Sequence, residues 1–399
     1  MNKGFSRLFE IVNKEKRTII GLMSGTSLDG LDIALCDFTG SGTTTQVTLR
    51  EFATVPYSKE FKDKVKAVFS KRQVDLENVC LMNAYIGSFH AELINNCLQQ
   101  WNIKPQEVDV IASHGQTIYH APVSLHKLDG MPDATLQIGD GDHMAVKTGI
   151  VTLSDFRQKH IAAGGEGAPL AVYGDYLLFS EQGQNRIMLN IGGIANFTFL
   201  PGDLDTSKIF STDVGPGNTL MDAYVQAKFP GKYYDAEATI ASEGTCNNAL
   251  LTALLDHSFF DQGFPKTTGP ELFNLAYLEQ AQKRSGTEAL SPSDVMATLN
   301  RFSATGISDA LTKALKEECF EIFLSGGGMH NPLLIQHLKE MLPGVPLRNT
   351  SELGVAPDAK EAVLFATLAN ECLFGELIDF GAGQKSVPSV HMGKISLPE

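Results

Sequence analysis

The feature that most constrains this fold is a pattern of elements that occurs twice along the chain. Each copy begins with a strand, a turn rich in small residues, two further strands and helices, and later has a strand that ends in a polar or glycine-rich turn. In the first copy the expected strands are residues 18–23, 31–38, 46–55 and 109–113, and the helices are 59–69 and 81–101. In the second copy the expected strands are residues 186–191, 196–200, 208–212 and 321–325, with a helix at 218–229. The repeat predicts two similar α/β domains.

Three turns in this pattern are rich in small residues: Ser24–Gly30, Gly192–Asn196 and Gly326–Gly328. Uncovered backbone N–H groups in such turns bind phosphate, and ligands of α/β sheets lie where loops converge outside the strand ends. A hairpin such as Ser24–Gly30 can also simply close a sheet, and taken alone it leaves both readings open. The chain has neither a P-loop nor a G-x-G-x-x-G signature, which leaves an actin-like (sugar kinase or Hsp70-type) fold with a nucleotide cleft between two domains.

We expect an N-terminal lobe of residues 1–154 and a C-terminal lobe of residues 155–374, with the tail 375–399 packed across one lobe. The first lobe would hold the turn at residues 24–30, and the second would hold the turns at residues 192–196 and 326–328. No role is assigned to residues 1–17.

Composition excludes several classes of protein. The 399 residues are 43% hydrophobic and 20% charged, so a globular protein long enough for two domains is expected. A net charge of −14 argues against nucleic acid and anionic membrane surfaces, and favours a small-molecule partner. Six cysteines without a C-x-x-C pair suggest reduced thiols, and no signal peptide or membrane span is visible, so we expect a cytoplasmic protein.

Several motifs together resemble the anhydro-N-acetylmuramic acid kinase family of bacterial cell-wall recycling, over about residues 21–374. They are "GLMSGTSLDGLDIAL", "SHGQTIYH", "DFR", "AAGGEGAPL", "LNIGGIAN", "STDVGPGNTLMDA" and "FLSGGGMHN". Each glycine motif is weak alone, but "MSGTSLDGLD" and "DVGPGNTLMDA" at this separation are specific. The resemblance implies an ATP-dependent kinase that opens a 1,6-anhydro sugar with water and phosphorylates O6, giving N-acetylmuramic acid 6-phosphate and ADP.

The resemblance also implies the nucleotide contacts. The hairpin would cradle the β- and γ-phosphates, with Ser and Thr hydroxyls adding donors; Gly192–Asn196 would close the phosphate side and Gly326–Gly328 would meet the adenosine. The predicted nucleotide-binding residues are Ser24, Gly25, Thr26, Ser27, Leu28, Asp29, Gly30, Leu31, Gly192, Gly193, Gly215, Gly217, Asn218, Gly326, Gly327 and Gly328.

Asp213 is the candidate general base. It follows the expected strand at 208–212 and precedes "VGPGN", where an Asp can serve equally as a base or as a turn and cap residue. The resemblance assigns it the role of activating the water that attacks C1. Asp222, one helical turn into the next helix, is expected on the helix surface or bound to a neighbouring loop.

The sugar contacts are expected from two polar motifs and one helix. A lone His or Arg is more often structural, but the matched motifs favour sugar binding, and an Arg suits the lactyl carboxylate of such a sugar. Glu361 is placed at the sugar by the resemblance alone, against a solvated carboxylate as the alternative. The predicted sugar-binding residues are Ser113, His114, Gln116, Thr117, Asp155, Arg157 and Glu361.

Mg²⁺ is expected beside ATP, but the sequence does not select its ligands. The wider actin-like group begins its phosphate turns with Asp, whereas this chain has Met23 and Asn190, which leaves Asp29, Asp32 and Asp213 as candidates. A homodimer is implied by resemblance. Two alternatives stay open: a kinase of an ordinary sugar hydroxyl, and a non-catalytic actin-like regulatory protein that binds nucleotide.

Overall fold

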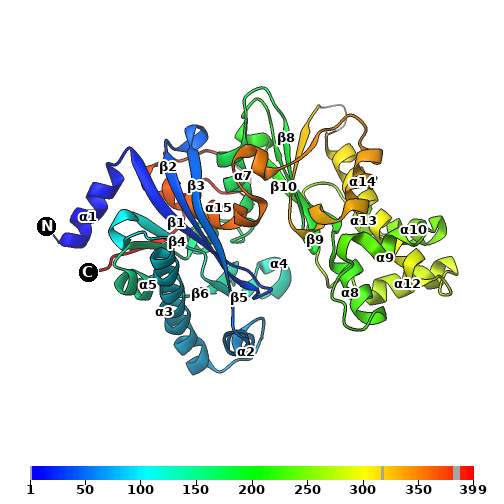
Figure 1. The fold of residues 1–399 in the computed structure, drawn as a ribbon, viewed down its shortest axis with the longest axis horizontal. Helices are drawn as coiled ribbons and strands as arrows, with labels where there is room; N and C mark the ends of the chain where they lie inside the picture. Colours follow the sequence, from blue (N-terminus) through cyan, green and yellow to red (C-terminus); the bar gives the residue numbers. More distant parts are fainter. Residues whose placement is uncertain (1, 316–318, 381–386) are drawn as a thin grey trace. The chain divides into compact units, whose positions relative to one another are not determined.

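The computed structural model describes residues 2–315, 319–380 and 387–399, and the chain divides into two compact units (Figure 1). Unit 1 consists of residues 1–179 and 354–399, and unit 2 of residues 180–353. The sequence prediction placed the boundary at residues 154 and 374 instead. The difference arises because helix α15 (Lys360–Phe374) packs against the first two strands of unit 1 and against helix α7 (Ala171–Phe179). The C-terminal strand β13 (Lys394–Ser396), within the tail that was expected to pack on one lobe, pairs with the sheet of unit 1.

Unit 1 is built on a six-stranded sheet with the order β13-β7-β4-β1-β2-β3. Its other strands are β1 (Lys16–Ser24), β2 (Gly30–Thr39), β3 (Gln46–Pro56), β4 (Val110–Ser113) and β7 (Val151–Ser154), with a separate hairpin of β5 (Gln116–Ala121) and β6 (Ala134–Ile138). Its other helices are α1 (Lys3–Val12), α2 (Lys59–Val68), α3 (Leu76–Gln100), α4 (Val123–His126), α5 (Gly141–Thr148), α6 (Phe156–Ala162) and α7 (Ala171–Phe179). Strands β1, β2 and β3 are antiparallel, and β4 and β7 continue parallel to β1.

Unit 2 repeats this arrangement in a five-stranded sheet with the order β10-β9-β8-β11-β12. Its strands are β8 (Arg186–Ile191), β9 (Ile194–Leu200), β10 (Phe210–Pro216), β11 (Glu321–Ser325) and β12 (Leu347–Asn349). Its helices are α8 (Thr219–Lys228), α9 (Thr239–Ser242), α10 (Asn248–Leu255), α11 (Ser258–Asp261), α12 (Leu275–Ser285), α13 (Pro292–Leu315) and α14 (Pro332–Met341). Three antiparallel strands are again followed by two parallel ones, which confirms the predicted repeat of two similar α/β domains.

Helices cover both faces of the sheet in unit 1, so its central strands need apolar or small residues on both faces. Ile20 and Leu22 of β1 join the apolar core under α2 and α3, whereas Gly21 between them faces α15. A Cβ at Gly21 would lie 1.9 Å from the carbonyl oxygen of Ala362, so only glycine permits this close approach of strand and helix. Strand β2 is buried on both faces for the same reason: Ala34 and Cys36, which alternate with Leu31, Ile33 and Leu35, are also buried.

Two predicted elements have different bounds in unit 2. Strand β10 does not end before Asp213 but continues to Pro216, because Gly215 and Pro216 still pair with β9. A bulge between Asp213 and Gly215 interrupts that pairing. The turn expected at 192–196 is shorter than predicted, since β9 already begins at Ile194.

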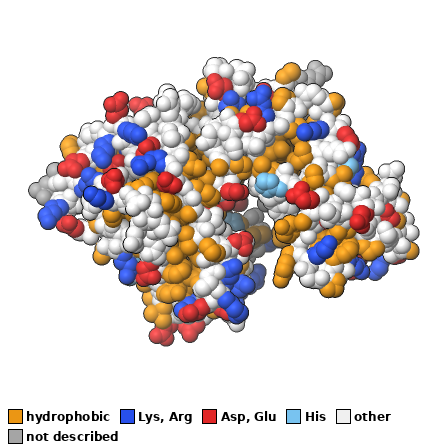
Figure 2. All heavy atoms as spheres, viewed as in Figure 1, with side chains coloured by type: hydrophobic (Ala, Val, Ile, Leu, Met, Phe, Trp, Pro, Cys, Tyr) orange, Lys and Arg blue, Asp and Glu red, His pale blue; other side chains and the backbone are white. Residues whose placement is uncertain are grey.

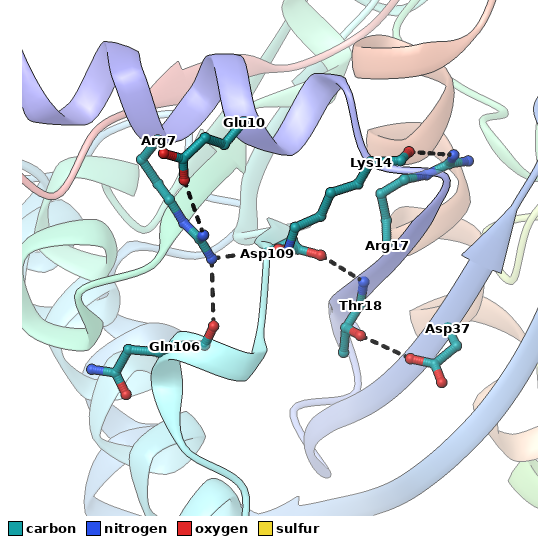
Figure 3. A network of polar contacts seen from close by, with 8 residues as sticks. All are labelled: Arg7, Glu10, Lys14, Arg17, Thr18, Asp37, Gln106 and Asp109. Carbon is teal, nitrogen blue, oxygen red and sulfur yellow. Dashed lines mark hydrogen bonds and ion pairs between the residues drawn. The ribbon is translucent and has the colours of Figure 1, made fainter.

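The segment of residues 2–17 is tied to the sheet of unit 1 by a polar network around Asp109 (Figure 3). The Asp109 carboxylate accepts hydrogen bonds from Lys14 Nζ at 2.5 Å and from the backbone N–H of Thr18 at 3.0 Å, and Arg7 lies 3.5 Å away. Thr18 Oγ1 donates to Asp37 Oδ1 at 2.8 Å. The network fixes α1 against the start of β1, which gives this segment a structural role.

The distribution of charged side chains and the state of the cysteines can be compared with what the composition predicts. On the face in Figure 2, Lys and Arg lie among Asp and Glu rather than in one continuous basic area. No helix in the described part of the chain is long and apolar enough to cross a membrane. All six cysteines are free thiols.

Candidate active site

The first phosphate turn is the connection between β1 and β2, and only part of it is accessible. Thr26, Ser27 and Asp29 are exposed, whereas Leu28 is 1% exposed and anchors the turn in the core with a φ of 60°. Leu28 N–H donates to the carbonyl of Gly25 at 3.3 Å, which closes the turn. The three exposed residues are therefore the ones whose polar groups are available to a ligand, while Leu28 shapes the loop.

Ser24, which ends β1, belongs to a buried chain of hydrogen bonds, here called the Tyr57 chain (His90, Tyr57, Ser24 and Gln116). Tyr57 Oη donates to Ser24 Oγ at 2.8 Å, and Ser24 Oγ donates to Gln116 Oε1 at 2.6 Å. Since the Tyr57 hydroxyl proton is used on Ser24, Tyr57 Oη accepts from His90 Nε2, which lies 3.0 Å away. Burial lowers the pKa of His90 to about 3, so the imidazole is neutral and carries its proton on Nε2.

The Tyr57 chain changes the expected role of Ser24. The hydroxyl was expected to donate to phosphate, but its proton is already directed at Gln116 and its side chain is only 1% exposed. Gln116 Nε2 in turn lies 3.5 Å from the carbonyl oxygen of Gly25. Ser24 and Gln116 therefore hold the shape of the turn in this structure, instead of presenting free donors to a ligand.

Two of the predicted sugar-binding residues, His114 and Arg157, are in direct contact. Arg157 Nη2 donates to His114 Nε2 at 2.9 Å, so His114 is protonated on Nδ1, which donates to the carbonyl oxygen of Ser24 at 3.1 Å. Burial, helped by the charge of Arg157, lowers the pKa of His114 to about 3. Desolvation lowers the pKa of Arg157 to about 10, so the guanidinium stays charged near neutral pH. Gln137 Nε2 donates to the carbonyl oxygen of His114 at 2.9 Å.

The remaining predicted sugar residues lie at several places in unit 1. Ser113 is fully buried at the end of β4 and accepts from the N–H of Gly115 at 3.2 Å, whereas Thr117 is half-buried in β5. Asp155, at the start of α6, pairs with Lys394 at 2.5 Å. Glu361 is exposed in the first turn of α15 and acts electrostatically on Arg157. Ser113 and Asp155 are thus engaged by the protein, and Thr117 and Glu361 keep accessible surface.

In unit 2 the structure brings three segments with predicted nucleotide-binding residues together: 192–193, 215–218 and 326–328. The carbonyl of Gly193 accepts the N–H groups of Gly217 and Thr219, and that of Gly192 accepts the N–H of Asn218, all at 2.9–3.0 Å. These bonds join the β8–β9 turn to the N-terminus of α8. Gly326 lies against the same corner with a φ of 81°, and a Cβ there would be 2.5 Å from Asn190 Oδ1.

Asp213 is half-buried on the bulge of β10, where its carboxylate is held on one side only. Its Oδ2 accepts the backbone N–H of Thr268 at 2.8 Å, and its Oδ1 has no hydrogen-bond partner among residues 2–315, 319–380 and 387–399. Burial raises the pKa of Asp213, as does Glu271, while the Thr268 N–H opposes this shift. A carboxylate with one free oxygen and a raised pKa can accept a proton from a bound water or hydroxyl.

Asp222 is half-buried in the first turn of α8, and burial raises its pKa to about 6. The Asp222 side chain makes no hydrogen bond within the described ranges. Neither its surroundings nor the sequence assigns a ligand to Asp222. It provides a second carboxylate with a raised pKa, three residues beyond the start of the helix, with which Asp213 can be compared.

A preformed metal centre is not found in the described part of the chain, where no three His, Cys, Asp or Glu side chains form a group that could hold an ion. Of the candidates, Asp29 is exposed beside the first phosphate turn. Asp32 accepts from Thr54 Oγ1 at 2.6 Å, and its pKa is raised by burial and by the charges of Asp358 and Asp29.

Sequence reasoning missed five residues that hold the site together: Tyr57, His90, Gln137, Lys266 and Thr268. None stands in a glycine-rich or polar motif, and their contacts at the site join positions 23 to 55 residues apart in the sequence. Only "SHGQT" signalled part of this arrangement, through His114 and Gln116.

The repeated sheet order and the clustered glycine turns define an actin-like or sugar-kinase-like α/β fold. Within that class, residues 17–379 match the family model of anhydro-N-acetylmuramic acid kinase. The chain is 56% identical, over the full length of both proteins, to the anhydro-N-acetylmuramic acid kinase of Pseudoalteromonas atlantica. It is 37% identical to that of Caldanaerobacter subterraneus subsp. tengcongensis, covering 98% of this chain and all of the relative. The chain belongs to the anhydro-N-acetylmuramic acid kinase family, a family of enzymes that use ATP and a small sugar.

Solved structures give a weaker likeness. Component A of the (R)-2-hydroxyglutaryl-CoA dehydratase of Acidaminococcus fermentans is 12% identical with a TM-score of 0.42, covering 88% of this chain and 98% of its own. A ROK family glucokinase from Streptomyces griseus, in complex with glucose and AMPPNP, is also 12% identical, with a TM-score of 0.35 and coverages of 88% and 98%. These scores are too low to carry an argument, and the family assignment rests on the family model and the relatives.

Proposed function

We propose that this kinase couples two events on one substrate: water opens the 1,6-anhydro bridge of anhydro-N-acetylmuramic acid, and the released O6 takes the γ-phosphoryl group of ATP. The oxygen of water bonds to C1, the C1–O6 bond breaks, and O6 bonds to phosphorus as the bond to ADP breaks. Asp213 takes the proton of the attacking water. The products are N-acetylmuramic acid 6-phosphate and ADP.

The observation that carries this proposal is the environment of the Asp213 carboxylate. An inverting attack at a sugar carbon requires a carboxylate base with room for water, and transfer of the leaving oxygen to phosphorus removes the need for a separate acid. Oδ1 of Asp213 has no partner among the described residues, Oδ2 is oriented by Thr268, and burial raises the pKa toward the working range of a base.

The other site residues divide by unit. The exposed polar groups of Thr26, Ser27 and Asp29 are proposed to meet the phosphates, with Gly192, Gly193, Gly215, Gly217, Asn218 and Gly326–Gly328 as the nucleotide-binding residues of unit 2. The charged Arg157, oriented by His114, is proposed to bind the sugar's carboxylate, with Glu361 beside it.

Mg²⁺ is proposed to accompany ATP and to neutralise charge on the transferring phosphoryl group. Mg²⁺ is commonly bound by one or two carboxylates together with phosphate oxygens and water, which the exposed Asp29 fits, with the more engaged Asp32 as the second candidate. A homodimer and a cytoplasmic location remain predictions from the sequence.

The test is turnover of the anhydro sugar with ATP and Mg²⁺ in ¹⁸O-labelled water, followed by mass spectrometry of the product. The proposal requires one label at C1 together with a new phosphate. Phosphate without label would show that a pre-existing hydroxyl is phosphorylated, and Asp213 would then deprotonate that hydroxyl.

The variant that tests the base is Asp213→Asn, matched by Asp222→Asn. Both exchange a half-buried carboxylate with a raised pKa for an amide within the same β10–α8 segment. We expect Asp213→Asn to lose about 10²- to 10⁴-fold in kcat while it still binds ATP. Turnover like that of Asp222→Asn would remove Asp213 from its role.

A further inference from the structure

The sheet alone does not fix the position of Asp213. Asp213 of β10 pairs with Asn196 of β9, and the next pair is Gly215 with Ala195. Val214 therefore has no partner on β9 and is the extra residue of a β-bulge. In addition, β10 lies at the edge of the sheet. A carboxylate at a bulge on an edge strand needs support from outside the sheet if it is to act on one defined atom.

That support comes from residues 266–268, which run along the free edge of β10. The N–H of Asp213 donates to the carbonyl of Lys266 at 3.0 Å, and the N–H of Lys266 donates to Thr212 Oγ1 at 2.9 Å. The N–H of Thr268 then reaches the Asp213 carboxylate itself at 2.8 Å. The same short segment thus holds both the backbone and the side chain of Asp213.

The Lys266 side chain anchors this segment in turn. It is only 8% exposed, and its Nζ donates to the carbonyl of Phe259 in α11 at 2.9 Å. Nζ lies 4.2, 5.8 and 5.2 Å from the ring centroids of Phe259, Phe260 and Phe264. A buried ammonium group keeps such a position because the aromatic faces and the carbonyl replace part of its hydration.

No charge is needed at this place for packing, since a methionine of similar length fills an aromatic cage equally well. The charged groups that act on Lys266 are Lys313 and Asp261, and neither is an ion-pair partner of it. The Lys266 ammonium group therefore serves to hold its hydrogen bond to the Phe259 carbonyl. This bond links α11 to the 266–268 segment, which orients Asp213.

The geometry points to Lys266 as a positioning residue for the reaction: through its contact with Phe259 it holds the 266–268 segment, whose Thr268 N–H aims the Asp213 carboxylate. This inference rests on the proposed function, in which Asp213 is the base. Lys266 acts through Thr268 and Asp213, without touching substrate or the reacting atoms.

The test compares Lys266→Met with Lys313→Met. Lys313 is a matched control because its exposed Nζ also donates to a backbone carbonyl, that of Phe260 at 3.1 Å, and its charge lies close to Lys266 without contacting the 266–268 segment. We expect Lys266→Met to lose about 10- to 100-fold in kcat, with KM for ATP within about twofold of the wild type. Because the Thr268 N–H stabilises the ionised Asp213, loosening it raises the carboxylate's pKa, and the acid limb of the kcat/KM profile shifts to higher pH.

Two further measurements separate positioning from general damage. ATP affinity and the melting temperature of Lys266→Met show whether it is folded, and Lys266→Arg keeps the charge while changing the reach of the donor. Because Arg also donates to carbonyl oxygens, partial recovery of kcat and of the acid limb in Lys266→Arg supports the donor contact with Phe259. An unshifted acid limb in Lys266→Met, or activity equal to that of Lys313→Met, would overturn the inference.

A double variant distinguishes this failure from failure of the proposed function. If Lys266 acts only through Asp213, adding Lys266→Met to Asp213→Asn causes no further loss of kcat. A full additional loss contradicts the positioning role even when Asp213→Asn alone is inactive. Near-normal turnover of Asp213→Asn would instead refute the assignment of the base, whatever Lys266→Met does.

Discussion

Removal of one hydroxyl from the Tyr57 chain tests whether buried hydrogen bonds stabilise the first phosphate turn. In Tyr57→Phe the ring keeps its packing, with centroids 4.2 Å from Phe61 and 6.2 Å from Phe89. Two hydrogen bonds disappear, at 2.8 Å to Ser24 and 3.0 Å to His90. The change therefore isolates the polar contribution of Tyr57 from its apolar one.

The expected magnitude follows from what is left behind. A buried hydrogen bond contributes about 1 kcal/mol net, but a buried donor left without an acceptor costs about 1–3 kcal/mol. His90 is fully buried, and its Nε2–H loses its acceptor, while Ser24 keeps its bond to Gln116. We expect Tyr57→Phe to lower the free energy of unfolding of unit 1 by about 2–3 kcal/mol.

The assay is urea unfolding followed by tryptophan fluorescence. Trp101 is the single tryptophan of the chain and packs against the apolar core of unit 1, so its signal reports on this unit alone. Tyr85→Phe is the matched control, because Tyr85 stacks on Phe89 in the same aromatic cluster at 6.0 Å without belonging to the Tyr57 chain. Equal shifts for the two variants would refute the reasoning.

A second variant sharpens the interpretation. Adding His90→Phe to Tyr57→Phe removes the orphaned donor, and replacing both members of a buried polar pair is less costly than removing one. The double variant should therefore be more stable than the sum of the two single changes, by about 0.5–3 kcal/mol. Strict additivity would show that the two groups do not depend on each other.

Two further predictions concern unit 1. Gly21→Ala should destabilise it by about 3 kcal/mol or more in the Trp101 assay, since the new Cβ would lie 1.9 Å from the carbonyl of Ala362, whereas Gly25→Ala, with 3.6 Å to its nearest neighbour, should have little effect on stability. His90 is neutral when folded, with a pKa of about 3 against an ordinary value of 6.5, so the unfolded chain binds more protons between these values and stability falls as pH drops below about 6.5. His90→Gln keeps an N–H donor without titrating, and its unfolding free energy should therefore change with pH less steeply than that of the wild type, by up to about 1.4 kcal/mol per pH unit between pH 6 and 4. Parallel pH profiles for the two proteins would contradict this.

The sequence by itself determined the repeated elements and the class of reaction. Strands β1, β2, β8 and β11 follow from short apolar runs bounded by glycine or polar turns, because such signals lie within a few neighbouring residues. The motifs around Gly25 and Asp213 carried the family resemblance, which the family model and the relatives confirm. Their individual roles in binding and catalysis remain proposals.

The tertiary structure alone decided which polar groups are free. The motif around Ser24 predicts a hydroxyl that donates to phosphate. In the structure this hydroxyl donates to Gln116 instead, which lies 92 positions further along the chain. The Asp213 carboxylate is oriented by Thr268, 55 positions away, and α15 joins unit 1 although residues 180–353 separate the two parts of that unit. These contacts depend on which distant segments the packing brings within hydrogen-bond reach, and no local periodicity or motif encodes that distance.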